Sequence, residues 1–341
     1  MDQSDATASV RGERKAPATI YDIARHTGFS PSTVSRALNK PGRLNATTER
    51  RIRDAAEELG YRINPMARAL PTGKTGTLGL VVSDITNPVY FDLVRGAEHI
   101  ASEADSTLIF ADSQESARLE RSIAERLQTS VDGLLLVGSR LGDQDIRELS
   151  SVKPLVVVNR LVDGVPAVVP DVAPGIEAAL GALRERGHRR IAYLAGPEAS
   201  WMNTLRWQTL FDLAVSWGLS IVEIKSTEPT RAGGAEAFQR IVAADVTAVF
   251  AYNDLIALGL LRASRDRGVA VPESLSIVGF DDIFGADLPT PALSSIRSPL
   301  GELGERATRR LLTEIDGAPA EAGAALPTRF IDRESIAAVR S

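Results

Sequence analysis

Short apolar runs that alternate with helical stretches restrict the fold of this chain more than any other feature. They predict strands, in a first series at 78–82, 108–111, 134–137, 155–158 and 165–169 and in a second series at 191–194, 221–224, 248–251 and 275–278. Helical stretches separate the first four runs of the first series, near 89–102, 115–128 and 143–150. Continuous apolar strands between helices are typical of parallel sheets that are buried on both faces. The two series therefore predict an α/β body of two doubly wound lobes, with ligands expected at the carboxyl ends of the strands.

A different pattern precedes residue 76, where three short amphipathic helices are expected. The first helix begins after a Thr19 cap and stops at Gly28, which suits a left-handed C-cap. The second begins after a Ser30 cap, and the third extends from an Asn45 cap to Gly60. A short turn separates the first two helices, as a helix-turn-helix requires.

The charge of the chain is divided unevenly between these two parts. Residues 11–74 carry 13 Lys and Arg against 6 Asp and Glu, whereas residues 75–341 carry 26 against 36. A basic N-terminal part on an acidic body indicates that only the basic part meets a polyanion. Charge alone leaves open an ordinary solvated face of exposed arginines.

The exposed side of the second helix has the composition of a DNA-reading surface. It consists of Pro31, Ser32, Thr33, Ser35 and Arg36. Short hydroxyl side chains allow a helix to lie deep in the major groove, and an arginine can pair with guanine through two hydrogen bonds. The spacing by itself leaves open the alternative that the three helices serve only as a structural cap.

Several kinds of site are disfavoured by what the sequence lacks. The chain has no cysteine, so a disulfide framework and a cysteine-ligated zinc site are excluded. Its three histidines, His26, His99 and His188, have no metal-ligand spacing, and neither a metal nor a cofactor is expected. The Gly-Lys-Thr triplet at 73–75 lacks the earlier glycine of a phosphate-binding loop. No enzyme motif is present and no catalytic residue is identified, so an enzyme is not expected.

Membrane and export segments are not expected either. No apolar run approaches the roughly 18 residues of a membrane-spanning helix. Residues 1–17 lack the apolar core of a secretory signal and predict a disordered tail. We therefore expect a cytoplasmic protein without a membrane partner.

Two stretches connect the N-terminal part to a known family. TIYDIARHTGFSPSTVSRALN, residues 19–39, resembles almost residue for residue the N-terminal signature of the LacI–GalR (lactose and galactose repressor) family, and LGYRINPMARAL, residues 59–70, is similar to the continuation of that signature. The resemblance implies that Pro31, Ser32 and Arg36 read bases. The residues that it implies for positioning on the DNA backbone are Thr19, Tyr21, Ser30, Thr33, Ser35 and Asn39.

The same resemblance implies a hinge helix that enters the minor groove. Its expected DNA contacts are Asn64, Ala67 and Leu70, with Leu70 as an apolar wedge between base pairs. An ordinary interdomain contact is the alternative for Leu70. The expected divisions of the chain are a tail 1–17, a helix-turn-helix domain 18–63, a hinge helix and linker 64–76, and an effector-binding and dimerisation domain 77–335. The lobes of that last domain are expected at about 77–170 with 298–325, and at about 171–297 with 326–335.

Loops at the ends of the predicted strands resemble those of the family and of the related periplasmic sugar-binding proteins. The segment 84–90 is similar to a loop whose two aromatic residues flank the ligand, and the motif 279–282 is expected to be structural. The residues expected to bind the effector are Val89, Tyr90, Asn159, Arg160, Trp201, Arg206, Asp254 and Ser298. Arginine, aspartate and asparagine beside an aromatic ring suit a polyol. Taken singly, each polar residue could instead be a helix cap or a surface ion pair.

Departures from the family pattern indicate a reshaped pocket. Val89 stands where the family has an aromatic residue, Val172 where it has asparagine and Thr209 where it has glycine. Trp201 is expected to line the cleft, and Trp207 is expected to belong to the core. The effector could therefore be a sugar, a nucleoside or another small polar metabolite.

Together these features predict a sequence-specific DNA-binding transcriptional regulator, a repressor whose operator affinity changes with a small effector. Its expected fold is an all-α helix-turn-helix head with a hinge helix, followed by a periplasmic-binding-protein-like α/β body with two doubly wound parallel sheets. The resemblance implies a homodimer, and hence a pseudo-palindromic double-stranded operator with half-sites about one helical turn apart. The alternative is a solute-binding protein of the periplasmic sugar-binding type without a DNA function, which the body alone would fit.

Overall fold

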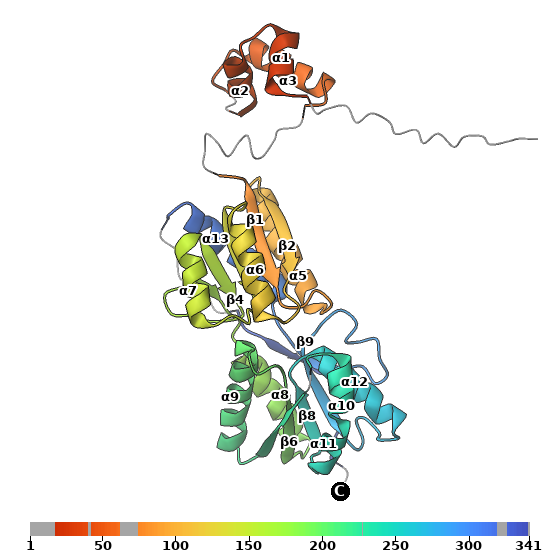
Figure 1. Cartoon of the computed structure of the whole chain (residues 1–341). Helices are drawn as coiled ribbons and strands as arrows, with labels where there is room; N and C mark the ends of the chain where they lie inside the picture. Colours follow the sequence, from red (N-terminus) through yellow and green to blue (C-terminus); the bar gives the residue numbers. More distant parts are fainter. Residues whose placement is uncertain (1–17, 40–41, 62–73, 227, 319–325, 340–341) are drawn as a thin grey trace, which may run out of the picture. The chain divides into compact units, whose positions relative to one another are not determined.

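The computed structural model describes residues 18–39, 42–61, 74–226, 228–318 and 326–339 (Figure 1). The chain divides into two compact units, Met1–Thr75 and Gly76–Ser341. The expected tail 1–17 and the expected hinge contacts at Asn64, Ala67 and Leu70 lie outside the described residues.

Three helices form the described part of the first unit. They are α1 (Ile20–Thr27), α2 (Pro31–Asn39) and α3 (Ala46–Glu58). Thr19 caps α1 through a reciprocal capping box, and Gly28 ends this helix with a φ of 75°. The Oγ of Ser30 accepts a hydrogen bond from the Thr33 N–H at 3.2 Å, and the Asn45 side chain caps α3. The capping residues of the sequence analysis are thereby confirmed.

A small apolar core joins these helices. Its buried residues are Ile23, Ala24, Val34, Ala37, Ile52, Ala55 and Ala56. Each helix contributes one apolar face, and helices of this length are not stable alone in water. The three helices therefore depend on one another, and α2 is held with its polar face outward.

The first lobe of the second unit is a five-stranded parallel sheet with the order β2-β1-β3-β4-β5. Its strands are β1 (Thr77–Val82), β2 (Thr107–Asp112), β3 (Gly133–Val137), β4 (Leu155–Val158) and β5 (Ala167–Val168). The helices that pack on it are α5 (Val89–Glu103), α6 (Ala117–Gln128), α7 (Asp143–Val152) and α13 (Leu300–Ile315).

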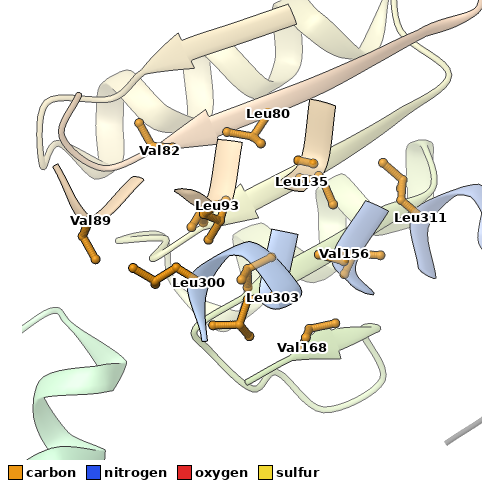
Figure 2. Close-up of a cluster of buried hydrophobic side chains, with 14 of the residues drawn as sticks. Leu80, Val82, Val89, Leu93, Leu135, Val156, Val168, Leu300, Leu303 and Leu311 are labelled. Carbon is orange, nitrogen blue, oxygen red and sulfur yellow. The ribbon is translucent and has the colours of Figure 1, made fainter. Parts of the chain in front are cut away.

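Both faces of the inner strands β1, β3 and β4 are buried, as the continuous apolar runs predicted. Leu80 and Val82 of β1 pack with residues of α5 and α13, among them Leu93 and Leu303, in the cluster drawn in Figure 2. The intervening Val81 packs on the other face with residues of α6 and α7. Side chains of a strand alternate between the two faces, so a strand covered on both sides must be apolar throughout.

The second lobe is a six-stranded sheet with the order β11-β10-β9-β8-β6-β7, parallel except for β11. Its strands are β6 (Arg190–Ala195), β7 (Ser220–Lys225), β8 (Ala248–Ala251), β9 (Ser276–Asp281), β10 (Ser294–Arg297) and β11 (Arg329–Ile331). One face is covered by α8 (Ala173–Glu185) and α9 (Trp201–Ser216). The other face is covered by α10 (Arg231–Glu236), α11 (Phe238–Ala243) and α12 (Asp254–Asp266).

The chain passes between the lobes more than once. Strand β10 belongs to the second sheet, α13 packs on the first, and β11 returns to the second. The apolar pattern did not predict β10, because two serines and one arginine make up most of it. The expected fold class, a helical head followed by two α/β lobes with parallel sheets, is confirmed.

Candidate functional site

The outward face of α2 carries the side chains expected to read DNA. Ser32 and Arg36 are exposed, whereas Val34 and Ala37 are fully buried against the other helices. The Oγ of Ser30 lies 2.9 Å from that of Ser32, so the two hydroxyls are hydrogen-bonded at the start of the helix. The result is a short polar ridge with one arginine on a rigid three-helix support.

The remaining expected DNA contacts surround this ridge. Thr19 and Pro31 are exposed, and Tyr21 on α1 has 69% of its surface accessible. Thr33 and Ser35 are half-buried on α2. Asn39 is the last residue of α2, and the hinge residues lie outside the described part of the chain. An exposed tyrosine of this size has no role in the small core, which is consistent with a contact surface.

The first lobe contributes a half-buried tyrosine and a buried arginine side chain at the ends of its strands. Tyr90 lies at the start of α5, and its hydroxyl forms a hydrogen bond with Ser83 at 2.6 Å. Arg140 follows β3 and donates two hydrogen bonds to Glu115, at 2.6 and 3.1 Å, and one to the Gly138 carbonyl at 2.7 Å. Burial raises the pKa of Tyr90, so its hydroxyl stays protonated at neutral pH.

Arg140 also lies close to the second lobe. Burial lowers its pKa, but Tyr252 and Glu115 outweigh this effect and the net shift is upward. Tyr252 follows β8 of the second lobe, so groups from both lobes act on the same guanidinium. Arg140 therefore remains charged although its side chain is almost completely buried.

The second lobe contributes a buried ion pair. Arg206 on α9 donates from Nη2 to Asp281 Oδ1 at 2.7 Å and from Nη1 to the Tyr252 carbonyl. Its guanidinium carbon lies 3.6 Å from the centroid of the Phe280 ring. Burial lowers the pKa of Arg206, but Asp281 more than offsets this, so the net shift is upward. Arg206 is thus held in one orientation by two hydrogen bonds and a stacked ring.

Several buried polar atoms near these strand ends have no hydrogen-bond partner among the described residues. They include Oδ1 of Asn159, Nε of Arg160, Oγ of Ser298 and Nε of Arg206. Asn159 follows β4, and Ser298 follows β10, where the chain leaves the second lobe for the first. Buried polar groups are nearly always hydrogen-bonded, so these atoms mark places where a ligand or water can bind.

A pocket of about 500 Å³ opens between the two lobes. Thr86 and Pro88 line it from the first lobe, in the loop that leads to Tyr90. The lining residues from the second lobe are Thr230, Arg231, Ala232, Leu255, Leu258, Ile283 and Phe284. Its volume is that of a small-molecule site.

Some expected effector contacts are placed elsewhere. Both Nη atoms of Arg160 bind the loop 139–143, through two carbonyl oxygens and Asp143. Val89 is buried in the apolar core of the first lobe (Figure 2). Asp254 is fully buried, with both carboxylate oxygens accepting hydrogen bonds inside the protein. Both Asp254 oxygen atoms are thus used inside the protein, whereas Nε of Arg160 has no hydrogen-bond partner among the described residues.

The two tryptophans differ less from each other than expected. Trp207 stacks on Tyr193 with ring centroids 5.7 Å apart, as a core residue would. Trp201, expected to line the cleft, is half-buried and packs against the same apolar cluster of the second lobe.

Sequence reasoning missed Arg140, Tyr252 and Asp281. Each follows or ends a strand whose position was predicted, so the rule that ligands bind at carboxyl ends could have found them. Asp281 was assigned a structural role together with its glycine-containing motif, and only the structure places it against Arg206.

Other kinds of site find no support in the described part of the chain. No group of three His, Asp or Glu side chains there could hold a metal ion. None of the helices in the same described ranges is long and apolar enough to cross a membrane.

A helix-turn-helix unit and a two-lobed body with an interlobe pocket define the class of DNA-binding regulators that have an effector domain. Residues 19–64 match the bacterial regulatory proteins of the lacI family, and residues 180–336 match the periplasmic binding protein-like domain. The HTH-type transcriptional repressor CytR of Escherichia coli (strain K12) is 32% identical over 332 residues, which cover 95% of this chain and 96% of that protein. The chain belongs to the lacI family of transcriptional regulators.

Solved structures agree with this assignment. The lac repressor dimer bound to operator and the anti-inducer ONPF has a TM-score of 0.85 at 23% identity, over 95% of this chain and all (100%) of that one. The cellobiose complex of the transcriptional regulator CelR has a TM-score of 0.70 at 29% identity, over 93% of this chain and 99% of that one. Membership of a family of regulators excludes the enzyme, and the DNA-binding part excludes a solute-binding protein without a DNA function.

The ion pair should be essential to the stability of the second lobe. Arg206→Met leaves the Asp281 carboxylate buried and unpaired, which is expected to lower the free energy of unfolding by about 3–5 kcal/mol. The double variant Arg206→Met/Asp281→Asn removes the stranded charge and should regain most of this loss. Urea unfolding of wild type, both single variants and the double variant measures the coupling. Additive losses would contradict a direct interaction between the two side chains.

Proposed function

We propose that the outward face of α2 reads an operator sequence and that a small polar effector, bound between the lobes, changes operator affinity. The observation that supports the effector part is the cluster of Arg140, Tyr252, Arg206 and Asp281, hereafter the interlobe cluster. It combines charged and aromatic groups of both lobes. A ligand that contacts both lobes favours one relative arrangement of them, which is how occupancy can alter a distant equilibrium.

On the DNA side, we assign base reading to Pro31, Ser32 and Arg36. The positioning contacts on phosphates are assigned to Thr19, Tyr21, Ser30, Thr33, Ser35 and Asn39. The exposure of Ser32 and Arg36 on a helix with a buried opposite face supports this division. Minor-groove contacts by Asn64, Ala67 and Leu70 complete the proposal on the strength of the sequence resemblance. Since the DNA of a bacterial cell lies in its cytoplasm, we place the protein there.

Arg36→Ala should reduce affinity for the preferred operator roughly 10- to 100-fold and remove preference at one base pair of each half-site. The reason is the loss of a two-hydrogen-bond contact to guanine. The operator is obtained by selection from random duplexes, and affinities are measured by fluorescence anisotropy. Arg53→Ala, an exposed arginine of α3, removes the same charge and serves as the control. Equal weakening of all sequences by Arg36→Ala would contradict base reading.

For the effector we propose a sugar, a nucleoside or a similar polyhydroxylated metabolite. Arg206 with Asp281 offers both donors and acceptors, and Tyr252 adds an aromatic face, which together suit hydroxyl groups on a ring. The free oxygen atoms of Asn159 and Ser298 add further hydrogen-bond capacity at the strand ends. The cellobiose in the complex of the related CelR is an example of this chemistry. Tyr90 and Trp201 are the aromatic side chains that we place nearest to the ligand.

A thermal-shift screen of sugars and nucleosides against the full chain tests this assignment. A compound present at 100 times its Kd should stabilise the protein by about 2.7 kcal/mol, because it binds only the folded state. Arg140→Met should abolish the thermal shift, because it removes one of the charged groups proposed to bind the ligand. The variant should still fold, because Glu115 is partly exposed and tolerates the loss of its partner. Arg147→Met, which removes an exposed arginine of α7, should keep the thermal shift. A shift that survives Arg140→Met would exclude the interlobe cluster as the binding site.

We further propose a homodimer formed through the side of the body that carries α5, β2 and α12 (Figure 1). Apolar side chains are exposed there, with Phe284 at 83% and Leu288 at 75% of their surface. A pocket of about 490 Å³ beside Leu288 is rimmed by Arg262 and Arg265. Asp287 precedes Leu288, so this face presents an exposed apolar side chain next to an acidic one. It also presents a pocket with apolar walls and two arginines at its rim. In a two-fold contact the same patch of both subunits meets, so Leu288 and Asp287 of one subunit can pack against the arginine-rimmed pocket of the other.

Leu288→Asp should weaken self-association on the order of 100-fold, because it would bury an unpaired charge at the contact. Sedimentation velocity at several concentrations measures the change, and operator affinity should fall with it. Val152→Asp on α7 alters an apolar residue of similar exposure, 69%, and should leave the dimer intact. If both variants or neither dissociate, this face is not the contact.

A further inference from the structure

A fully buried carboxylate lies beside the end of β9. Asp254 begins α12 and has none (0%) of its surface exposed. Its Oδ1 accepts a hydrogen bond from the Ser295 hydroxyl at 2.6 Å, and its Oδ2 accepts one from the Ile283 N–H at 2.8 Å. A Cβ at position 279 would lie 2.0 Å from Oδ1, so Gly279 leaves the room that the carboxylate occupies.

The groups that this carboxylate and Ser295 hold belong to one turn, residues 281–283. Asp281 has a φ of 98° and Asp282 a φ of 53°. Residues other than glycine rarely adopt a positive φ, and such a backbone conformation persists only where surrounding contacts enforce it. The Ser295 hydroxyl accepts the Asp282 N–H at 3.1 Å while it donates to Asp254. Two successive N–H groups of the strained turn are therefore fixed by the Asp254–Ser295 pair.

The turn connects the interlobe cluster to the first lobe. At one end Asp281 accepts the hydrogen bond of Arg206. At the other end the Ile283 side chain is part of the apolar core of the first lobe and also lines the interlobe pocket. Between them Asp282 is paired with Arg297 and Arg333. The position of this short turn therefore fixes both the Asp281 carboxylate of the interlobe cluster and the apolar contact of Ile283 with the first lobe.

We propose that Asp254 and Ser295 are positioning residues that hold this turn, so that effector affinity depends on them although neither touches the effector. The inference rests on the proposed effector site. It replaces the direct contact that the sequence suggested for Asp254, whose two oxygen atoms are used inside the protein.

Ser295→Ala tests the proposal in the full chain. The substitution leaves the Asp254 carboxylate and the Asp282 N–H each without one partner, so the turn should open more often. Hydrogen exchange of the amides of Asp282 and Ile283 should become faster on the order of tenfold or more. Affinity for whichever of D-ribose, cellobiose and uridine stabilises the wild type should fall by a similar factor.

Ser335→Ala is the matched control. Ser335 is equally buried, and its hydroxyl also makes two hydrogen bonds, to the Ile277 carbonyl and from the Ser294 N–H. It should cost similar stability while leaving the exchange of the turn and the ligand affinity unchanged. Asp254→Asn, which keeps one acceptor oxygen, should lose less affinity than Asp254→Ala.

The outcomes separate this inference from the proposed function. If no probe binds the wild type, the effector assignment fails, and the exchange of the turn amides still decides whether the Asp254–Ser295 pair holds the turn. If a probe binds and Ser295→Ala and Ser335→Ala behave alike in exchange and affinity, the positioning role is overturned. Faster exchange of the turn in Ser295→Ala alone, with unchanged ligand affinity, would also overturn it.

Discussion

The second lobe depends at its inner end on the buried pair of Arg206 and Asp281. Two opposite charges can remain away from water only if each is paired and further hydrogen-bonded, and here the Tyr252 carbonyl and the Phe280 ring complete the surroundings of the guanidinium. The hydrogen bonds of Arg206 connect α9 to the ends of β8 and β9.

The body joins its lobes through segments that belong to both. Ile283 follows a strand of the second sheet but packs in the core of the first lobe, and Arg140 of the first lobe lies within electrostatic reach of Tyr252. Contacts of this kind would couple the arrangement of the lobes to occupancy of the proposed effector site. A ligand can shift that arrangement only by interacting differently with its two states.

Much of the fold could be read from the sequence, since it depends on local periodicity and capping. The runs at 155–158 and 248–251 coincide with β4 and β8. A strand that is buried on both faces is apolar at every position, so the first and last apolar residues mark its ends. The caps at Thr19 and Ser30 were also predicted, because they require only neighbouring residues. Strand β10 was not, because its burial comes from elements far away in the chain rather than from its own composition.

The sequence by itself determined the family, the helix-turn-helix and the two doubly wound lobes, all of which are written in spacing and residue type. Only the tertiary structure decided which polar side chains have their partners inside the protein. Asp254 has the same chemistry as Asp281, but both of its oxygen atoms accept hydrogen bonds from Ser295 and Ile283, whereas Asp281 pairs through Oδ1 with Arg206. A side chain's hydrogen-bond capacity is shared out among neighbours that are distant in sequence, and that distribution exists only once the chain has folded.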